Sequence, residues 1–304
     1  MKPAHRHIAG YLFGLGAGAV WGTTGPLSTA LYAEGAALTG IGFWRILLGT
    51  AAFALWGLYD RDLFRIDRRG LLLVGGLGGA LVALFEVAYQ FGIAGAGVAG
   101  AAALLYLAPV AVAVLARPIL GERLTALRLS LAVVVMVGAW LTVRGGHPGL
   151  SGVPITSLFV GVTGGLLAAA SYAGTTILAR WAVPRYGTFK VLFWEIGGGT
   201  LLLALVLPLA GQTPLPPTTG AGWLFVLALA AGPVVLANVF FFSAVKHIDA
   251  APTAIAATIE PVVGALLALM LFDQRLEMFG WVGLALVILG VSAGYLREAR
   301  EDRG

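Results

Sequence analysis

Four charged side chains stand inside otherwise apolar runs of the sequence, where they are the residues most able to do chemistry. They are Arg45, Glu86, Glu195 and Glu260. A charged group deep in a membrane helix is costly, so each is expected to face protein or water instead of lipid. For Arg45 and Glu195 two interpretations stay open: a local ion pair that holds a helix in place, or a direct role in substrate binding or gating.

The third apolar run carries a polar stripe at helical spacing. Glu86, Tyr89 and Gln90 stand at positions i, i+3 and i+4, which share one face of an α-helix. A later run repeats this spacing with Asn238, Phe241 and Phe242. Two facing stripes of this kind predict a cavity that holds a flat apolar side chain and hydrogen-bonds the polar end of an amino acid. The alternative is that both stripes are ordinary helix contacts.

Further polar and aromatic side chains are expected at a similar depth. The substrate-binding candidates among them are Trp21, Thr24, Tyr106, Ser171 and Tyr172, with Ser28, Thr175 and Thr258 beside them. Pro26, Pro109, Pro233 and Pro261 interrupt the runs, and the carbonyl groups they free are tolerated only where protein or water satisfies them. This favours cavity walls. Glu260, next to Pro261, has either a substrate role or a structural one.

The elements that must position these residues are long apolar runs, each of about the length needed to cross a bilayer as a helix. We predict ten such spans: Ile8 to Leu31, Leu38 to Tyr59, Gly70 to Ala94, Ala96 to Ala116, Leu124 to Val143, Leu158 to Ala179, Thr188 to Ala210, Ala221 to Val245, Ala251 to Phe272 and Met278 to Leu296. The fifth and tenth spans are almost free of polar groups, so we expect them to lie outside the cavity, facing lipid or a second subunit of a homodimer.

The composition agrees with a membrane protein and excludes several other classes. Of 304 residues 59% are hydrophobic and 11% charged, whereas soluble domains carry roughly 25% charged residues. Ten spans leave no room for a soluble enzymatic domain. The chain has no cysteine, and its four histidines lie at or beyond span ends. We therefore predict no catalytic residue, no metal site and no cofactor. The expected partners are the lipid bilayer and a small-molecule substrate, not nucleic acid.

The distribution of Lys and Arg predicts the orientation. With the N-terminus inside, sixteen of the 19 basic residues fall at the cytoplasmic side. The exceptions are Arg144 and Arg275 outside and Arg45 within a span. Because cytoplasmic loops carry an excess of Lys and Arg, both termini are expected to be cytoplasmic.

An internal repeat divides the chain into two halves. A shift of about 152 positions places Leu107-Ala108-Pro109-Val110 on Ile259-Glu260-Pro261-Val262, and Gly121-Glu122-Arg123-Leu124 on Asp273-Gln274-Arg275-Leu276. The same shift places the Glu86 stripe on the Asn238 stripe, and a shift of about 150 places Trp44-Arg45 on Trp194-Glu195. Five spans per half is an odd number, so the second half enters the membrane inverted. The predicted domains are residues 1–144 and 158–304, with 145–157 as the linker.

These paired blocks, together with Trp21-Gly22, Pro26 and Trp44-Arg45, resemble the EamA family of the drug/metabolite transporter superfamily. The chain is similar overall to YddG-type exporters of aromatic amino acids. The resemblance covers essentially the whole chain and implies an all-α integral membrane fold, with ten transmembrane helices as two inverted five-helix repeats, in a bacterial inner membrane. One departure is that the second half reads Asp273-Gln274-Arg275, so the role of Glu122 need not be repeated at the outer side.

The function that this resemblance implies is a secondary transporter that exports aromatic or other small apolar amino acids by alternating access. Three alternatives stay open. The same fold could carry another metabolite or a drug cation. An integral-membrane enzyme acting on a lipid-linked substrate would need clustered acids, histidines or metal ligands, and the spans offer only isolated carboxylates. A passive channel would need a ring of like charges, which the Gly-rich spans lack.

Overall fold

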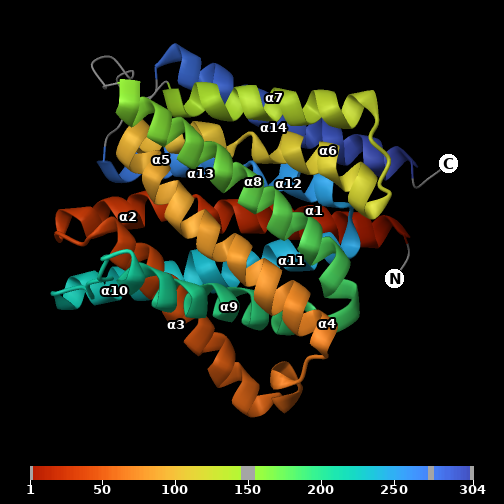
Figure 1. Ribbon diagram of the computed structural model, residues 1–304. Helices are drawn as coiled ribbons and strands as arrows, with labels where there is room; N and C mark the ends of the chain where they lie inside the picture. The colour runs from red at the N-terminus through yellow and green to blue at the C-terminus, as the bar shows by residue number, and fades with distance from the viewer. Residues whose placement is uncertain (1–2, 145–154, 273–276, 302–304) are drawn as a thin grey trace.

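The computed structural model describes residues 3–144, 155–272 and 277–301, and these residues form helices and connections without a β-strand (Figure 1). The helices of the first half are α1 (Pro3–Trp21), α2 (Thr24–Ala33), α3 (Leu38–Tyr59), η1 (Arg61–Phe64), α4 (Arg68–Gly70), η2 (Leu71–Gly78), α5 (Gly79–Leu105), α6 (Ala108–Leu120) and α7 (Ala126–Arg144). Those of the second are α8 (Ile155–Tyr186), α9 (Thr188–Leu209), α10 (Gly220–Leu229), η3 (Ala230–Leu236), α11 (Ala237–His247), α12 (Ala250–Ala257), α13 (Glu260–Phe272) and α14 (Met278–Glu301).

Eight helical stretches of the described chain are long and apolar enough to cross a membrane. The two other predicted spans coincide with shorter helices. The first is divided between α1 and α2 by a turn at Gly22 and Thr23, and the apolar part of the fifth is Ala126–Thr142. The protein is therefore an all-helical membrane protein, and the count of ten spans stays a prediction. The predicted linker lies mostly outside the described residues, because α8 begins at Ile155.

Two membrane helices are interrupted at matching positions of the two halves. The helix breaks between α5 and α6 at Tyr106 and Leu107, and between α12 and α13 at Thr258 and Ile259. Tyr106 and Thr258 are related by the same shift of 152 positions that aligns the sequence repeat. Each new helix carries a proline at its second position, where the missing N–H has no helical partner to lose.

The chain reverses direction within α5. A Cβ atom on Gly92 would lie 3.2 Å from the Cβ of Ala101, although nine residues of straight helix would separate them by about 13 Å. The reversal lies where the predicted spans Gly70 to Ala94 and Ala96 to Ala116 meet, although α5 is assigned as helix throughout. It lets the spans Arg68–Tyr89 and Ala101–Leu120 lie beside each other.

Glycines allow several helices to pack with their backbones in close approach. A Cβ on Gly14 would lie 2.8 Å from the Cβ of Ala256, and one on Gly22 would lie 2.8 Å from the Cβ of Val263, so α1 lies directly on α12 and α13. On α9, a Cβ at Gly198 would overlap the carbonyl oxygen of Gly75 in η2. Small residues have this packing role in membrane helices generally.

Replacing Gly198 with Ala is expected to destabilise the protein by about 1–3 kcal/mol, because the added methyl group forces α9 and η2 apart. The neighbouring Gly197→Ala is the matched control, since its Cβ would make an ordinary contact of 3.4 Å with Thr50 Cγ2. Thermal unfolding in detergent measures both. Equal melting temperatures for the two variants would show that the α9–η2 approach does not limit stability.

The fifth and tenth predicted spans, α7 and α14, pack against each other along one side of the molecule (Figure 1). Val135 and Val287 are fully buried between them, and a Cβ on Gly138 would lie 2.9 Å from the carbonyl oxygen of Gly283. The predicted lipid or second-subunit contact of this pair stays a prediction.

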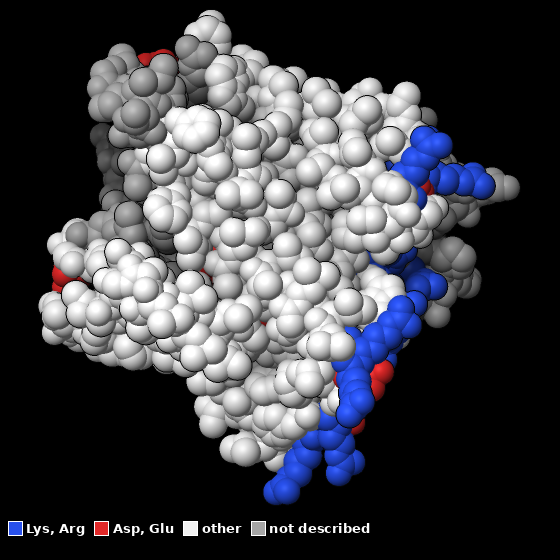
Figure 2. Space-filling view, in the orientation of Figure 1, with Lys and Arg blue, Asp and Glu red and all other residues white. Residues whose placement is uncertain are grey.

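Basic side chains gather at one end of the molecule, which carries α4 and the start of α1 (Figure 2). At this end Arg180 of α8 bonds both Asp249 (Nη2–Oδ1, 2.7 Å) and Glu122 (Nε–Oε1, 3.3 Å), and Arg128 of α7 bonds Asp249 (2.8 Å). Glu122 also accepts from the backbone N–H of Ala250. Burial raises the pKa of Glu122, and the nearby Asp249 carboxylate adds to the rise. The pairs Arg180–Glu122 and Arg128–Asp249 tie the two halves together here. The corresponding segment Asp273-Gln274-Arg275 lies outside the described residues.

Candidate functional site

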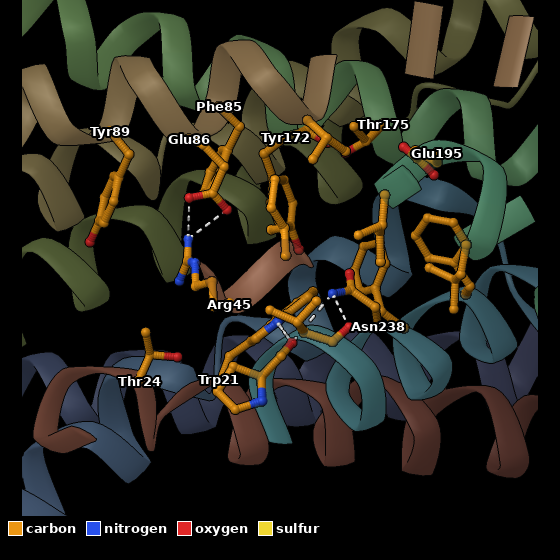
Figure 3. Close-up of a pocket in the computed structure, with 18 of the residues that line it drawn as sticks. Trp21, Thr24, Arg45, Phe85, Glu86, Tyr89, Tyr172, Thr175, Glu195 and Asn238 are labelled. Atoms are coloured by element: carbon orange, nitrogen blue, oxygen red, sulfur yellow. Dashed lines mark hydrogen bonds and ion pairs between the residues drawn. The ribbon is translucent and has the colours of Figure 1, made fainter. Parts of the chain in front are cut away.

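A pocket of about 160 Å³ lies between helices of both halves (Figure 3). Its walls are mainly apolar, with charged side chains at two places. In Figure 3 Arg45, Glu86 and Tyr89 lie on one side, Glu195 and Thr175 lie on the other, and Trp21, Tyr172 and Asn238 lie between them. The lining residues are Trp21, Thr24, Arg45, Ile46, Val82, Phe85, Glu86, Tyr89, Leu105, Tyr172, Thr175, Leu192, Glu195, Ile196, Pro233, Val234, Asn238, Phe241, Phe242 and Glu260.

On one side of the pocket Arg45 of α3 and Glu86 of α5 form an ion pair. Arg45 Nη2 lies 2.7 Å from Glu86 Oε1 and 2.8 Å from Oε2, and the side chains are 12% and 7% exposed. For Arg45 the structure therefore contains the local ion pair that the sequence left open. Because both charges line a pocket, the same pair presents a cation and an anion side by side to a ligand.

On the other side of the pocket Glu195 of α9 has no such partner. Its side chain is 1% exposed, and neither carboxylate oxygen has a hydrogen bond within the described residues. Of the two interpretations that the sequence left open for Glu195, the local ion pair is thus absent from the described structure. Glu195 lies nearer the basic end than Arg45 does, since Lys190, earlier on α9, pairs with Asp62 (2.6 Å) at that end.

Three aromatic rings form a cluster between the two charged sides. The centroids of Trp21 and Phe241 lie 5.2 Å apart, those of Tyr172 and Phe241 5.6 Å, and those of Trp21 and Tyr172 5.9 Å. Trp21 Nε1 donates to the carbonyl oxygen of Pro233 at 3.0 Å, which fixes the indole against η3. Rings at these separations attract one another, and their faces suit an apolar or aromatic guest.

Asn238 is engaged with its own helix. Its Nδ2 donates to the carbonyl oxygens of Val234 (2.8 Å) and Pro233 (3.3 Å), so the amide satisfies backbone groups of the π-helical turn η3. Irregular turns of this kind are frequent at functional sites, where they reshape a helix locally. The donor side of Asn238 is therefore structural.

Most of the residues that the sequence singled out come together in this pocket. They are Trp21, Thr24, Arg45, Glu86, Tyr89, Tyr172, Glu195, Asn238, Phe241, Phe242 and Glu260. Their proposed contact with a substrate stays a prediction. Glu260 makes no hydrogen bond or ion pair within the described residues.

Three predicted site residues are placed otherwise. Tyr106 lines a separate cavity of about 20 Å³ beside Tyr172 and Glu260, at the breaks of the two interrupted helices. Ser171 is buried but does not line the pocket, because neighbouring residues on a helix point about 100° apart and Tyr172 takes the pocket side. Gln90 belongs to α5, but its side chain lies outside the described part of the structure.

Several lining residues were missed because they are apolar. Val82 and Phe85 precede Glu86 and Tyr89 at positions i, i+3, i+4 and i+7, a spacing that places all four on one helical face. Phe85 stacks on Tyr89 with 5.7 Å between centroids. Helical spacing extended backwards from Glu86 would have found both.

Comparison with known families gives the class of the protein. The model of the EamA-like transporter family matches twice, over residues 8–144 and 159–293. The chain belongs to the EamA-like transporter family. It is thus a multi-pass membrane protein of a family of transporters, and the resemblance found from the sequence blocks is confirmed.

Relatives of this family member carry transporter names. An uncharacterized transporter of Archaeoglobus fulgidus is 26% identical over 88% of the chain and 90% of the relative. The pseudopaline exporter CntI of Pseudomonas aeruginosa is 29% identical over 70% of both proteins. The uncharacterized transporter YwfM of Bacillus subtilis is 26% identical over 92% of the chain and 91% of the relative. A solved crystal structure with 22% identity covers 96% of this chain and 98% of its own, with a TM-score of 0.77, and so shares the fold.

Proposed function

We propose that the protein is a secondary transporter of the bacterial inner membrane that exports aromatic or other small apolar amino acids. The observation that carries the proposal is the pocket, which joins the Arg45–Glu86 ion pair to the cluster of Trp21, Tyr172 and Phe241. The zwitterionic head of an amino acid matches an adjacent cation and anion, with its carboxylate on Arg45 and its ammonium on Glu86. The side chain then lies among the rings.

Transport by this pocket would use alternating access between two inverted five-helix halves, residues 1–144 and 158–304. The double match of the family model and the breaks at Tyr106 and Thr258 support the repeat. Interrupted helices at corresponding positions of two halves mark substrate sites in several transporter folds. At the basic end the bonds of Arg180 to Glu122 and of Arg128 to Asp249 join the halves, and they must break for the pocket to open there.

A second candidate substrate is an organic cation. It is favoured by Glu195 and Glu260, two further carboxylates in the pocket. Among the described lining residues Arg45 is the only basic side chain. A pocket with three carboxylates and one guanidinium attracts positive charge.

The direction of transport, export, is supported by the name of the pseudopaline exporter among the relatives.

Counterflow in proteoliposomes tests the substrate class. Vesicles holding the purified protein and loaded with unlabelled phenylalanine are expected to take up labelled phenylalanine, and labelled leucine more slowly. Labelled tetraethylammonium serves as the organic-cation probe, with protein-free vesicles as the control. Counterflow of tetraethylammonium without counterflow of either amino acid would replace the first proposal with the second.

Both termini are proposed to be cytoplasmic, and single cysteines test this in a chain that has none of its own. Arg65→Cys, at the exposed basic end, is expected to resist a membrane-impermeant maleimide added to intact cells, whereas Gln212→Cys, in the exposed loop after α9, is expected to react. Lysed cells give the control, because both sites should then react. Reaction of Arg65→Cys in intact cells would invert the proposed orientation.

A further inference from the structure

The pocket wall at Glu195 carries a carboxylate that the binding of an amino acid head at Arg45 and Glu86 does not explain. Glu195 is 1% exposed, lines the pocket, and has two carboxylate oxygens without a hydrogen bond in the described structure. In Figure 3 it lies across the pocket from Arg45 and Glu86. The ammonium and carboxylate of one amino acid share a single carbon atom, so a head group held at Arg45 and Glu86 leaves Glu195 to another part of the substrate.

The surroundings of Glu195 are built to keep its side chain in this place. A Cβ on Gly78 of η2 would lie 3.1 Å from Glu195 Cγ, so the missing side chain at Gly78 makes room for the carboxylate stem. Leu192 and Ile196 flank it on α9. The other charged groups lining the pocket are Arg45, which is bound to Glu86, and the carboxylate of Glu260.

A buried carboxylate without a donor is costly, such groups in membrane helices mark substrate pathways, and a positively charged ligand group that reaches the carboxylate removes its cost. No group of three or more His, Asp and Glu side chains in the described residues could hold a metal ion, so one carboxylate in an apolar wall points to an organic cation. The rings of Trp21 and Tyr172 lie between the two charged sides of the pocket (Figure 3), and the ring of Phe241 packs against both. Such rings accept an apolar stem and also attract a cationic group that lies over their faces.

We propose that Glu195 is a subsite for an ammonium or guanidinium group at the far end of the substrate's side chain. This rests on the proposed function, because it takes the amino acid head to be bound at Arg45 and Glu86. The preferred substrates are then amino acids whose aromatic or aliphatic stem crosses the ring cluster and ends in a positive charge. Glu195 thereby determines specificity at the side chain, and the ion pair recognises the head.

Two pairs of probes that differ only in the terminal charge test the subsite. They are 4-(aminomethyl)phenylalanine against 4-ethylphenylalanine, and lysine against 2-aminoheptanoic acid. The dissociation constant of each probe is measured directly by calorimetry on the purified protein in detergent. We expect the charged member of each pair to bind about tenfold or more tightly to the unaltered protein, the gain of one charge-assisted hydrogen bond. In Glu195→Gln the charged and uncharged members should bind about equally.

Matched variants separate the subsite from a general effect of mutation. Glu277→Gln removes an exposed carboxylate outside the pocket and should keep the full preference for charged probes. Glu195→Met, which also lacks the charge, should behave as Glu195→Gln does and provides a second test if the Gln variant fails to fold. Removing a buried charge that has no partner is not expected to lower the melting temperature.

The outcomes distinguish failure of the Glu195 subsite from failure of the proposed function. Equal binding of charged and uncharged probes to the unaltered protein overturns the subsite and leaves amino acid binding intact. A Glu195→Gln variant that weakens both members of a pair equally also overturns it. Tight, Glu195-dependent binding of the charged probes without binding of the uncharged ones supports the subsite and overturns the assignment to apolar amino acids. Failure of all four probes overturns both.

Discussion

Replacing Glu86 with Gln is expected to destabilise the protein by about 3–5 kcal/mol, because it leaves the Arg45 guanidinium buried without its counter-charge. Arg45→Gln should do the same by leaving Glu86 alone. In detergent this corresponds to a fall in melting temperature of roughly 5–10 °C. Both single variants are also expected to lose phenylalanine transport. Melting curves and counterflow on the same preparations measure the two effects.

The double variant Arg45→Gln and Glu86→Gln separates structure from function at this pair. Two amides leave no unpaired charge in the pocket wall, so most of the lost stability should return. Transport should not return, since neither amide carries the charge that an ammonium or carboxylate group needs. A double variant as unstable as the single ones would show that the pair does not act as a unit.

Replacing Phe241 with Leu is expected to weaken phenylalanine binding about tenfold while leaving leucine binding nearly unchanged. The ring of Phe241 contacts those of Trp21 and Tyr172, and an aromatic pair contributes about 0.5–1.5 kcal/mol beyond the apolar area it buries. The Leu side chain introduced at position 241 keeps an apolar group of similar size in the pocket wall. The substitution therefore removes only the aromatic ring. Calorimetric titration with the two amino acids measures the effect.

Phe240→Leu is the control for this substitution, because Phe240 neighbours Phe241 on α11 but packs at a tilt against Phe13 and does not line the pocket. Its binding of phenylalanine should be unaltered. A Phe241→Leu variant that loses phenylalanine and leucine affinity in equal measure would mean that the cluster supports the helices and does not contact the substrate's ring.

Much of the fold follows from the sequence because the length and hydrophobicity of a run are enough to predict a membrane helix. The boundary between the third and fourth spans and the interruptions next to Pro109 and Pro261 depend on local chemistry that the sequence displays. The divided first span was harder to foresee. Pro26 marks an interruption, but the turn at Gly22 and Thr23 leaves α1 and α2 as separate helices.

The polar residues of the candidate site were predictable from the sequence. Their apolar neighbours and the pairing of their charges were less so. Glu86 and Tyr89 stand out as polar groups in an apolar helix, whereas Val82 and Phe85 beside them look like any core residue. The pairing of Arg45 with Glu86 joins residues 41 positions apart and depends on how α3 and α5 pack. The same is true of the missing partner of Glu195, since no sequence pattern tells which of the three pocket carboxylates a single arginine will meet.

Counterflow of labelled phenylalanine in proteoliposomes, compared between the unaltered protein and the double variant Arg45→Gln and Glu86→Gln, tests whether the pocket carries the substrate. The pocket between the two halves is predicted to be the transport site. The unaltered protein should therefore give saturable uptake, and the stable double variant should lose it by on the order of 100-fold, the loss of two charge-assisted hydrogen bonds. Uptake by the double variant at the rate of the unaltered protein would show that the pocket with Arg45 and Glu86 is not the transport site.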